Sequence, residues 1–292
     1  MRYHDIFSFL SLNMETSRYD VPIFEEGDKI PKIIHQTYFK RELPDEIANS
    51  VHALKAKNPE WDYRLYDDDD IIEFIQKFYG DKILKYYFKI DKAYGAARAD
   101  FFRYLLMYKC GGVYLDIKSS VEPPLDSIIR TKDKIILSQW STSPRFEGAG
   151  IHDWDFADKI EGGEIQQWHI ICAPGHPYLR QVIQNVFRNI ETYIPGFHPI
   201  SANGVLAVTG PIAYTLAIIP LLHDGNHRFV RSHEEIGLVY SIYDDNKHHA
   251  KLFNQNYKTM MKPVVHVNLL RLGLSAIYRF FNLICLLRKR MS

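Results

Sequence analysis

The sequence has few cysteines, almost no net charge and no long apolar segment near its start. Its three cysteines, Cys110, Cys172 and Cys285, are widely spaced and odd in number, which excludes a disulfide framework and a clustered cysteine metal site. The 36 basic and 35 acidic residues give a formal net charge of +1. A nucleic-acid binder would need a basic excess, so we expect no nucleic-acid partner. The apolar patch at 6–12 is too short for a secretory signal or membrane anchor, which favours a cytoplasmic location.

What the sequence does contain is a core-forming composition and an uneven distribution of charge. Hydrophobic residues make up 46% and charged residues 24% of 292 residues, as in globular proteins with a core. Residues 269–292 carry five basic and no acidic side chains, which leaves 31 basic and 35 acidic residues in 1–268. We therefore predict a single domain over 1–268 and a basic tail over 269–292.

The basic tail has the pattern of an amphipathic helix. Its polar side chains follow helical spacing on an otherwise apolar stretch: Arg271, Ser275, Arg279 and Asn282. Because Arg279 lies in the middle of the stretch, a membrane span is disfavoured. The pattern is typical of a helix that lies on an anionic membrane surface, and it predicts peripheral association with the membrane. A terminal helix packed on the domain is the alternative.

Short β-rich segments alternate with helical patterns along the chain. The expected strands are 33–37, 61–67, 113–117, 134–140 and 166–174, and the expected helices are 44–57, 67–80, 91–110 and 176–194. This alternation predicts an α/β fold with a largely parallel sheet. The acidic run 67–70 is predicted to cap a helix, and Gly111 with Gly112 to end one.

The residues 98–126 combine charge with a favourable position in the predicted fold. Asp100 and Arg103 are three residues apart on a helix, so they share a face and can form an ion pair. Asp116 emerges at the carboxyl end of a predicted strand, where ligands bind in open α/β sheets. Spacing alone leaves open the alternative of a surface ion pair beside an ordinary turn residue.

Four segments resemble, in the same order, the family 32 glycosyltransferases, which carry a DXD sugar-binding region and include α-mannosyltransferase-like and bacterial capsular polysaccharide enzymes. The segments are IPKIIHQT (30–37), YRLYDDDD (63–70), RADFFRYLLMYKCGGVYLDIKSS (98–120) and TGP (209–211). The resemblance covers residues 30–270 and implies a Rossmann-like GT-A fold, a UDP- or GDP-linked sugar donor and transfer with retention. It divides the domain into a nucleotide-sugar-binding half, 30–126, and an acceptor half, 127–268.

The resemblance also implies the site residues. Asp116 matches the first aspartate of DXD, and Asp100 with Arg103 matches the pair that grips the donor. The residues predicted to bind the donor are His35, Gln36, Thr37, Arg98, Asp100, Asp116, Gly210 and His266. Asp116, Arg103 and Lys118 are the predicted catalytic residues. The resemblance implies that Asp116 contacts the ribose and the sugar, while Arg103, Lys118, His266 and any metal ion are the candidates for stabilising the negative charge on the departing diphosphate. For His35 and Gln36, ordinary strand-end polar residues remain the alternative.

The motif departs from the family where Lys118 replaces the second aspartate of DXD, so that it reads Asp-Ile-Lys. A protonated amine cannot ligate a divalent ion. Three explanations fit this departure. In the first, the ammonium of Lys118 replaces part of the positive charge of the metal ion. In the second, Asp116 and His266 hold Mn²⁺ or Mg²⁺ together with the diphosphate of the donor, and in the third, Lys118 points away and the protein is inactive. These three alternatives stay open at the level of sequence.

The sequence as a whole predicts a retaining glycosyltransferase of surface polysaccharide synthesis. The expected reaction moves a hexose or N-acetylhexosamine from the nucleotide sugar to a glycan or lipid-linked oligosaccharide. The Gly-rich segment 141–168, with tryptophans at 140, 154 and 168, is the predicted acceptor loop. The alternatives are a non-catalytic protein that binds sugar nucleotides or glycans, which Lys118 motivates, and an effector that glycosylates proteins.

Overall fold

A mixed six-stranded sheet lies at the centre of the fold. The computed structural model describes residues 21–140, 163–243, 259–269 and 271–273. The strand order is β2-β1-β3-β6-β5-β7, and a second small sheet pairs β4 with β8. The strands are β1 (Ile33–Thr37), β2 (Asp62–Tyr66), β3 (Gly112–Leu115), β4 (Ser120–Val121), β5 (Ile135–Gln139), β6 (His169–Cys172), β7 (Arg228–Ser232) and β8 (Leu238–Val239).

All strands of the large sheet except β6 run in the same direction. β1 is parallel to β2 and β3, β5 is parallel to β7, and β6 is antiparallel to both β3 and β5. The prediction of a largely parallel sheet is therefore confirmed, with β6 as the exception. Because β6 is reversed, the residues that precede it lie beside the carboxyl ends of the other strands. We call this side of the sheet the carboxyl edge.

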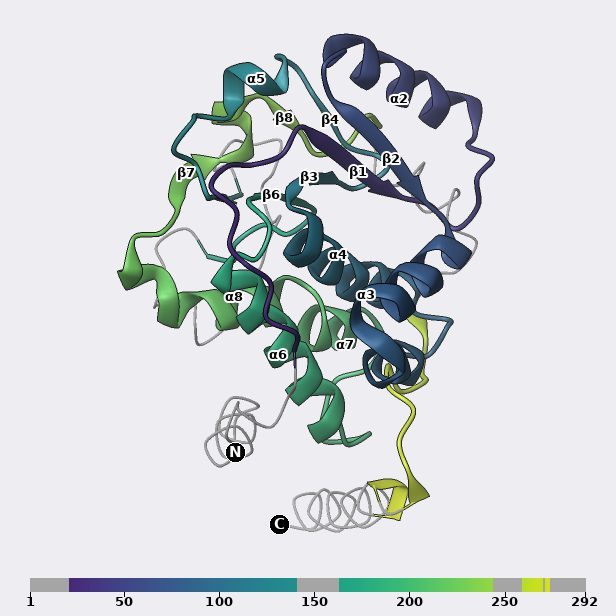
Figure 1. The fold of residues 1–292 in the computed structure, drawn as a ribbon. Coiled ribbons are helices and arrows are strands. Elements are labelled where there is room, and N and C mark those ends of the chain that lie inside the picture. The colour runs from purple at the N-terminus through teal and green to yellow at the C-terminus, as the bar shows by residue number, and fades with distance from the viewer. Residues whose placement is uncertain (1–20, 141–162, 244–258, 270, 274–292) are drawn as a thin grey trace, which may run out of the picture.

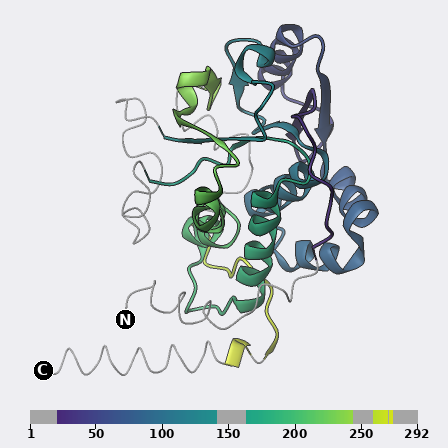
Figure 2. The same cartoon turned by 60° about the vertical axis from the view of Figure 1, so that its left-hand side comes forward.

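Helices cover both faces of the sheet and give three layers. Figure 1 shows α2 and α5 on one side of the strands and α4, α6 and α7 on the other, and Figure 2 shows the same layers after rotation. The helices are α2 (Asp45–Lys57), α3 (Asp68–Lys89), α4 (Gly95–Cys110), α5 (Leu125–Ile128), α6 (Pro177–Thr192), α7 (Ser201–Val208) and α8 (Pro211–Ile218), with short 3₁₀ helices η4 (Ile219–Asp224) and η5 (His233–Ile236). The predicted α/β fold is confirmed.

The two faces of the sheet have separate hydrophobic cores because side chains alternate along each strand. In β3, Val113 and Leu115 pack with Leu54 of α2 and Leu125 of α5, whereas Tyr114 faces the opposite layer. All four residues of β3 are buried, as expected of a central strand covered on both sides.

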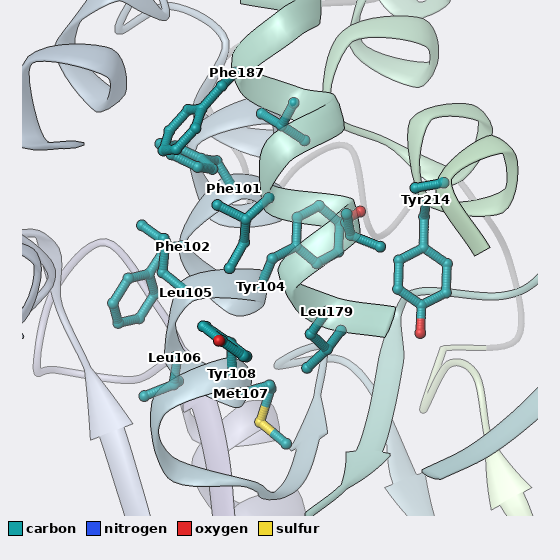
Figure 3. Packing of buried hydrophobic residues seen from close by; sticks show 14 of the residues in the cluster. Phe101, Phe102, Tyr104, Leu105, Leu106, Met107, Tyr108, Leu179, Phe187 and Tyr214 are labelled. Atoms are coloured by element: carbon teal, nitrogen blue, oxygen red, sulfur yellow. The ribbon is translucent and has the colours of Figure 1, made fainter. Parts of the chain in front are cut away.

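The larger core surrounds α4. Its bulky side chains between Phe101 and Tyr108 are fully buried, and Figure 3 shows Tyr104 on the side of Leu179 and Tyr214, with Phe102 and Leu106 on the other side. Phe102 meets Phe74 of α3 edge to face. Tyr104 stacks on Tyr214 at 5.5 Å between ring centroids, and Phe101 meets Phe187 edge to face at 5.6 Å. Each such buried side chain contributes about 1.5–3 kcal/mol. α4 therefore forms a rigid support beneath the carboxyl edge.

Local capping signals account for several helix boundaries. α2 begins at Asp45 and ends before Asn58, as predicted. The Asp67 carboxylate accepts hydrogen bonds from the backbone N–H groups of Asp69 and Asp70, which confirms the predicted cap of α3. Gly111, with a φ of 62°, ends α4.

One predicted boundary was wrong. The helix expected from residue 91 begins only at Gly95, because the Asp91 side chain accepts a hydrogen bond from the N–H of Ala93 and holds a turn there. The helix that opens at the acidic run was expected to stop at Gly80, and the backbone leaves helical geometry there, with a φ of 76° and a ψ of 176°. The second helical segment of α3, from this kink to Lys89, was not predicted.

The apolar run Ser201–Asp224 is long and apolar enough, by composition, to cross a membrane. Helices in the core of a protein are often as long and as apolar. In the described structure the run is divided into α7, α8 and η4, and 61% of its most apolar window is buried. It belongs to the core around α4, where Val205, Val208 and Tyr214 are buried.

Several predictions fall on residues outside the described ones. These are the apolar patch 6–12, most of the acceptor loop (141–162, including Trp154) and the tail from 274 onward. Of the tail, Arg271 is described: its guanidinium lies 3.6 Å from the Glu191 carboxylate of α6. The predicted amphipathic helix over 269–292 stays a prediction.

Candidate functional site

Arg103 is the centre of a buried ionic cluster at the carboxyl edge. Its Nη2 atom lies 2.9 Å from Asp116 Oδ1 and 3.3 Å from Asp100 Oδ1. The side chains of Arg103 and Asp100 are each 6% exposed. The predicted ion pair of Asp100 with Arg103 is confirmed, and the alternative of a surface pair is wrong.

Two polar residues that sequence analysis missed complete the cluster. Arg103 Nη1 donates to the backbone oxygen of Gln167 (2.9 Å) and to its Oε1 (2.8 Å), and Gln167 Nε2 donates to Asp100 Oδ1. Thr209 Oγ1 donates to Asp100 Oδ2 at 3.1 Å. Gln167 reaches the cluster because β6 runs antiparallel, a direction that no local pattern signals. Thr209 stands in the TGP segment, which was the available signal.

The environment of the cluster stabilises the charge of Arg103 and destabilises that of Asp100. Burial disfavours the charge on Arg103, but Asp116, Tyr114 and Asp100 together raise its pKa above the ordinary value, so the guanidinium stays charged. Burial raises the pKa of Asp100 to about 6, against the opposing effect of Arg103. Asp100 is therefore ionised at neutral pH and becomes protonated in mild acid.

Asp116 connects this buried cluster to solvent. Its side chain is 25% exposed. Its backbone is fixed by the N–H bond to the Trp168 oxygen (2.9 Å) and by its own oxygen, which accepts from Gln36 Nε2 and from the Ser119 N–H. Asp116 begins a turn, as the structural alternative held, but its carboxylate also faces the carboxyl edge with a guanidinium behind it. Such a carboxylate can accept hydrogen bonds from the hydroxyl groups of a sugar or ribose.

Gln36 and Thr37 of β1 lie within reach of Asp116. Thr37 Oγ1 is 3.0 Å from the hydroxyl of Tyr114, and that hydroxyl lies 3.5 Å from Asp116 Oδ1. Tyr63 donates to Gln36 Oε1 at 2.9 Å. The structure therefore brings together Gln36, Thr37, Asp116 and the buried ion pair.

His35 points away from that edge. Its ring nitrogens lie 3.1 Å from the hydroxyl of Tyr66 and 3.1 Å from the backbone oxygen of Gly111. Burial lowers its pKa to about 4, so the ring is neutral at physiological pH. Gly112 makes room for it, since a Cβ there would lie 2.6 Å from the Ile33 oxygen and 3.2 Å from His35 Nε2. The contacts fit the alternative of a structural polar residue, and donor binding by His35 stays a prediction.

Gly210 is also enclosed. Its N–H donates to the Val205 oxygen at 2.9 Å, and a Cβ would lie 2.8 Å from Leu206 Cα. The next residue, Pro211, has no N–H, so the start of α8 offers fewer donors to an anion than the motif predicted. Its neighbour Thr209 contacts Asp100 instead.

Arg98 and His266 lie at a different place, beside the connection from α3 to α4. Arg98 donates from Nε and Nη2 to the Ile90 oxygen, at 3.0 and 2.9 Å. The His266 side chain is 61% exposed, with Nε2 3.9 Å from Asp91 Oδ2. Among the described residues neither contacts Asp116.

The side chains present do not fit a divalent ion held in the manner of the family. Over the described ranges, no three His, Cys, Asp or Glu side chains gather into a metal-binding group. Asp116 Oδ1 is already paired with Arg103, and the predicted partner ligand His266 is beside Asp91. Metal binding by Asp116 and His266 stays a prediction without a geometric basis here.

Lys118 is turned toward an aromatic residue that sequence analysis missed. Its ammonium lies 3.9 Å from the centroid of the Tyr240 ring, and the whole residue is 7% exposed. Within the described part of the chain, Lys118 makes no ion pair with a carboxylate. The sequence offered no signal for Tyr240, which is far from Lys118 along the chain.

A separate surface hollow of about 430 Å³ lies between β2 and α3. Two of its basic side chains are paired with carboxylates: Arg41 with Asp67 (2.9 Å) and Asp70 (2.5 Å), and Arg64 with Asp62 (2.7 Å). None of the predicted site residues lines it. The carboxyl edge around Asp116 is therefore the better candidate site.

The sugar-binding region of a known family covers this part of the chain. The sequence model of the family described as "Glycosyltransferase sugar-binding region containing DXD motif" matches residues 44–134, which include Asp100, Arg103 and Asp116. The ligand-free glycosyltransferase domain from the YGT toxin has a similar structure, with a TM-score of 0.50 and 9% identity over 87% of this chain and 90% of that one. This likeness confirms the predicted GT-A glycosyltransferase fold.

Curated relatives are found among yeast mannosyltransferases. Inositol phosphoceramide mannosyltransferase 3 of Schizosaccharomyces pombe is 31% identical over 166 residues, which cover 56% of this chain and 39% of that protein. Initiation-specific alpha-1,6-mannosyltransferase of the same yeast is 27% identical over 224 residues, 72% of this chain and 52% of that protein. The chain thus spans less than two thirds of either relative. The match to the sugar-binding region and the similarity to the yeast mannosyltransferases support a family 32 glycosyltransferase-like assignment.

Proposed function

We propose that this protein is a glycosyltransferase that moves a hexose from a UDP- or GDP-linked donor to a glycan or lipid-linked acceptor. The observation that carries the proposal is the position of the Asp100, Arg103 and Asp116 cluster. It lies at the carboxyl edge of an α/β sheet and within the family's sugar-binding region. The names of the yeast relatives make mannose the first sugar to test.

Asp116 is the residue proposed to contact the donor. Its carboxylate accepts hydrogen bonds from sugar or ribose hydroxyls, while Arg103 holds it in place and Gln36 fixes its backbone. Arg103 itself is enclosed by Asp100, Asp116 and Gln167, so we propose that it positions Asp116 and does not touch the diphosphate. Its fixed positive charge also favours the negative charge that develops on the leaving group. We keep the proposed division into a nucleotide-sugar-binding half, 30–126, and an acceptor half, 127–268. Gln167 and Thr209 belong to the acceptor half by sequence but are proposed to support the donor site.

The finer features of the reaction rest on the family resemblance. We propose transfer with retention, through an oxocarbenium-like state, and assign no nucleophile. We also propose that N-acetylhexosamine is the alternative to a hexose and that the product is a surface polysaccharide. The enzyme is proposed to be cytoplasmic and to lie at the membrane surface. The apolar and basic composition of 269–292 supports contact with an anionic membrane and hence a lipid-linked acceptor.

The test is the substitution Asp116→Asn, which keeps the size of the side chain and removes its charge. We expect binding of the accepted sugar nucleotide to weaken roughly tenfold to hundredfold, since a hydrogen bond to a charged group contributes about 1.5–3 kcal/mol. A panel of UDP- and GDP-sugars, including GDP-mannose, is screened by thermal shift, and affinities are then measured by calorimetry.

The matched control is Asp62→Asn, an exposed carboxylate at the start of β2, with a side chain 55% exposed. It should bind the donor like the unchanged protein. Equal affinities for Asp116→Asn and the unchanged protein would refute the assignment of the site.

A non-catalytic sugar-nucleotide binder is the second candidate, because Lys118 stands where the family has an aspartate. Slow hydrolysis of the bound donor without acceptor distinguishes the two functions. Binding without hydrolysis or transfer of any sugar nucleotide in the panel, with and without Mn²⁺, would favour the non-catalytic protein.

A further inference from the structure

The Lys118 ammonium is held by a rigid aromatic group. Trp140 and Trp168 meet the Tyr240 ring edge to face, at 4.9 and 5.4 Å between centroids. The Lys118 ammonium lies 3.9 Å from the centroid of the same ring. A cation over the face of an aromatic ring is attracted by the ring's quadrupole, the more so when little water separates them.

The backbone fixes the same geometry. The segment around Tyr240 pairs with the segment after Lys118: Ser120 is paired with Val239 in the small sheet, and Ser119 Oγ donates to the Tyr240 oxygen at 2.7 Å. The Ile242 N–H donates to the Lys118 oxygen at 2.8 Å. Lys118 is therefore placed by contacts on both sides, unlike a lysine that extends from the surface.

Lys118 and Asp116 belong to one turn. The Ser119 N–H donates to the Asp116 oxygen at 2.8 Å and closes this turn at the end of β3. Trp168 connects the two residues a second time, because its backbone oxygen accepts from the Asp116 N–H while its ring supports Tyr240. The ammonium and the donor-facing carboxylate are thus held by a common framework.

The charge of the site requires a further cation. When Asp100 and Asp116 are both ionised, Arg103 offsets only one of the two negative charges. A nucleoside diphosphate brings additional negative charge to this edge. In a DXD protein the second aspartate recruits a divalent ion there, and here that position carries an ammonium without a carboxylate partner among the described residues.

Resting on the proposed function, we propose that Lys118, held on the ring of Tyr240, supplies the positive charge that neutralises the donor diphosphate, so that nucleotide binding needs no divalent ion. Lys118 contacts the diphosphate, and Tyr240 is a positioning residue that acts through Lys118. The ligand class is a nucleoside diphosphate, free or linked to a sugar.

The experiment measures binding of UDP and GDP to the full chain by calorimetry, in EDTA and in MnCl₂. We expect the unchanged protein to bind one of them equally well in both solutions. Lys118→Met should weaken binding roughly tenfold to hundredfold in both, because a hydrogen bond to a charged group is lost. Lys118→Arg, which keeps a cation, should retain most of the affinity.

Lys118→Asp is the most specific variant because it restores the second aspartate of the motif. We expect it to bind the nucleotide poorly in EDTA and to recover in MnCl₂, a gain of metal dependence that a purely structural role of Lys118 would not produce. Tyr240→Leu should weaken binding roughly threefold to tenfold, and Tyr240→Phe, which keeps the ring, should not.

The outcomes are distinguishable. If the unchanged protein binds only in MnCl₂, or if Lys118→Met binds as tightly as the unchanged protein, this inference is wrong while the proposed function stands. If neither UDP nor GDP binds the unchanged protein in either solution, both fail. Should Lys118→Met not fold, as judged by thermal unfolding, the Tyr240→Leu and Tyr240→Phe pair decides, and equal affinities for that pair would overturn the inference.

Discussion

Two buried polar clusters lie beside each other at the start of β6, and they differ in charge and in access to solvent. The charged cluster contains Asp100, Arg103, Asp116, Gln167 and Thr209. The neutral cluster contains Ser138, Gln166, His169 and His233. Ser138 Oγ lies 2.8 Å from His169 Nε2 and 2.7 Å from the side-chain amide of Gln166, and that amide lies 3.0 Å from His233 Nδ1. Neighbouring residues 166 and 167 thus serve different clusters.

The difference indicates which cluster acts on a ligand. Ser138 is fully buried and His169 is 1% exposed, whereas the side chain of Asp116 is 25% exposed at the carboxyl edge. Burying charges costs desolvation energy, so an ion pair is weak evidence for a purely stabilising role. Neutral hydrogen bonds satisfy buried polar atoms at lower cost. We therefore assign ligand contact to the charged cluster and packing to the neutral one.

The largest expected effect comes from removing the cation of the charged cluster. Arg103→Leu leaves Asp100 buried beside Asp116 without a counter-charge, and we expect it to lower the free energy of unfolding by about 3–5 kcal/mol. Urea unfolding followed by circular dichroism measures the loss. The control is Arg64→Leu, an exposed pair with Asp62, which should cost less than about 1 kcal/mol. Similar losses for the two variants would contradict the importance of burial.

The sequence predicted those members of the charged cluster whose positions depend on neighbouring residues in the chain. Asp100 and Arg103 share a helix face by spacing, and Asp116 follows a strand that the hydrophobic pattern marks clearly. The cap at Asp67 and the stop at Gly111 were predicted for the same reason, since each depends on residues within one turn. These features need no knowledge of the rest of the fold.

The remaining partners depend on tertiary structure. Gln167 and Trp168 reach the carboxyl edge only because β6 is antiparallel, and pairing direction is not encoded in an apolar run such as residues 169–172. Tyr240 meets Lys118 through the pairing of two-residue strands, which have no periodicity to detect. His35 was expected to face the donor, but its ring lies between the hydroxyl of Tyr66 and the backbone oxygen of Gly111, away from the carboxyl edge.

Acid should affect the two clusters with opposite sign. Burial lowers the pKa of His169 from 6.5 to about 3, so its contribution to stability is present above pH 6.5 and is lost as the pH falls toward 3. Burial raises the pKa of Asp100 from 3.8 to about 6, so its contribution is present below pH 3.8 and is lost as the pH rises to 6. Acidification from neutral pH to pH 5 should lower the free energy of unfolding by about 2 kcal/mol through His169 and raise it by about 1 kcal/mol through Asp100.

Two variants separate these contributions in urea unfolding over a series of pH values. Asp100→Asn should make stability fall more steeply between pH 6.5 and 5, because the opposing group is gone. His169→Gln should flatten the fall, whatever its effect on stability at neutral pH. The slope is the quantity compared, and parallel profiles for all three proteins would show that neither group controls the acid response.

The smallest effect tests the neutral cluster directly. Ser138→Ala removes the hydroxyl that lies between Gln166 and His169, and we expect it to lower the free energy of unfolding by about 1 kcal/mol, the usual net value of a buried hydrogen bond. Ser127→Ala, an exposed hydroxyl on α5, is the control and should cost less. Because no member of the neutral cluster faces the ligand in our assignment, Ser138→Ala should bind UDP or GDP like the unchanged protein. Weakened binding at full stability would place Ser138 in the donor site and remove the distinction between the two clusters.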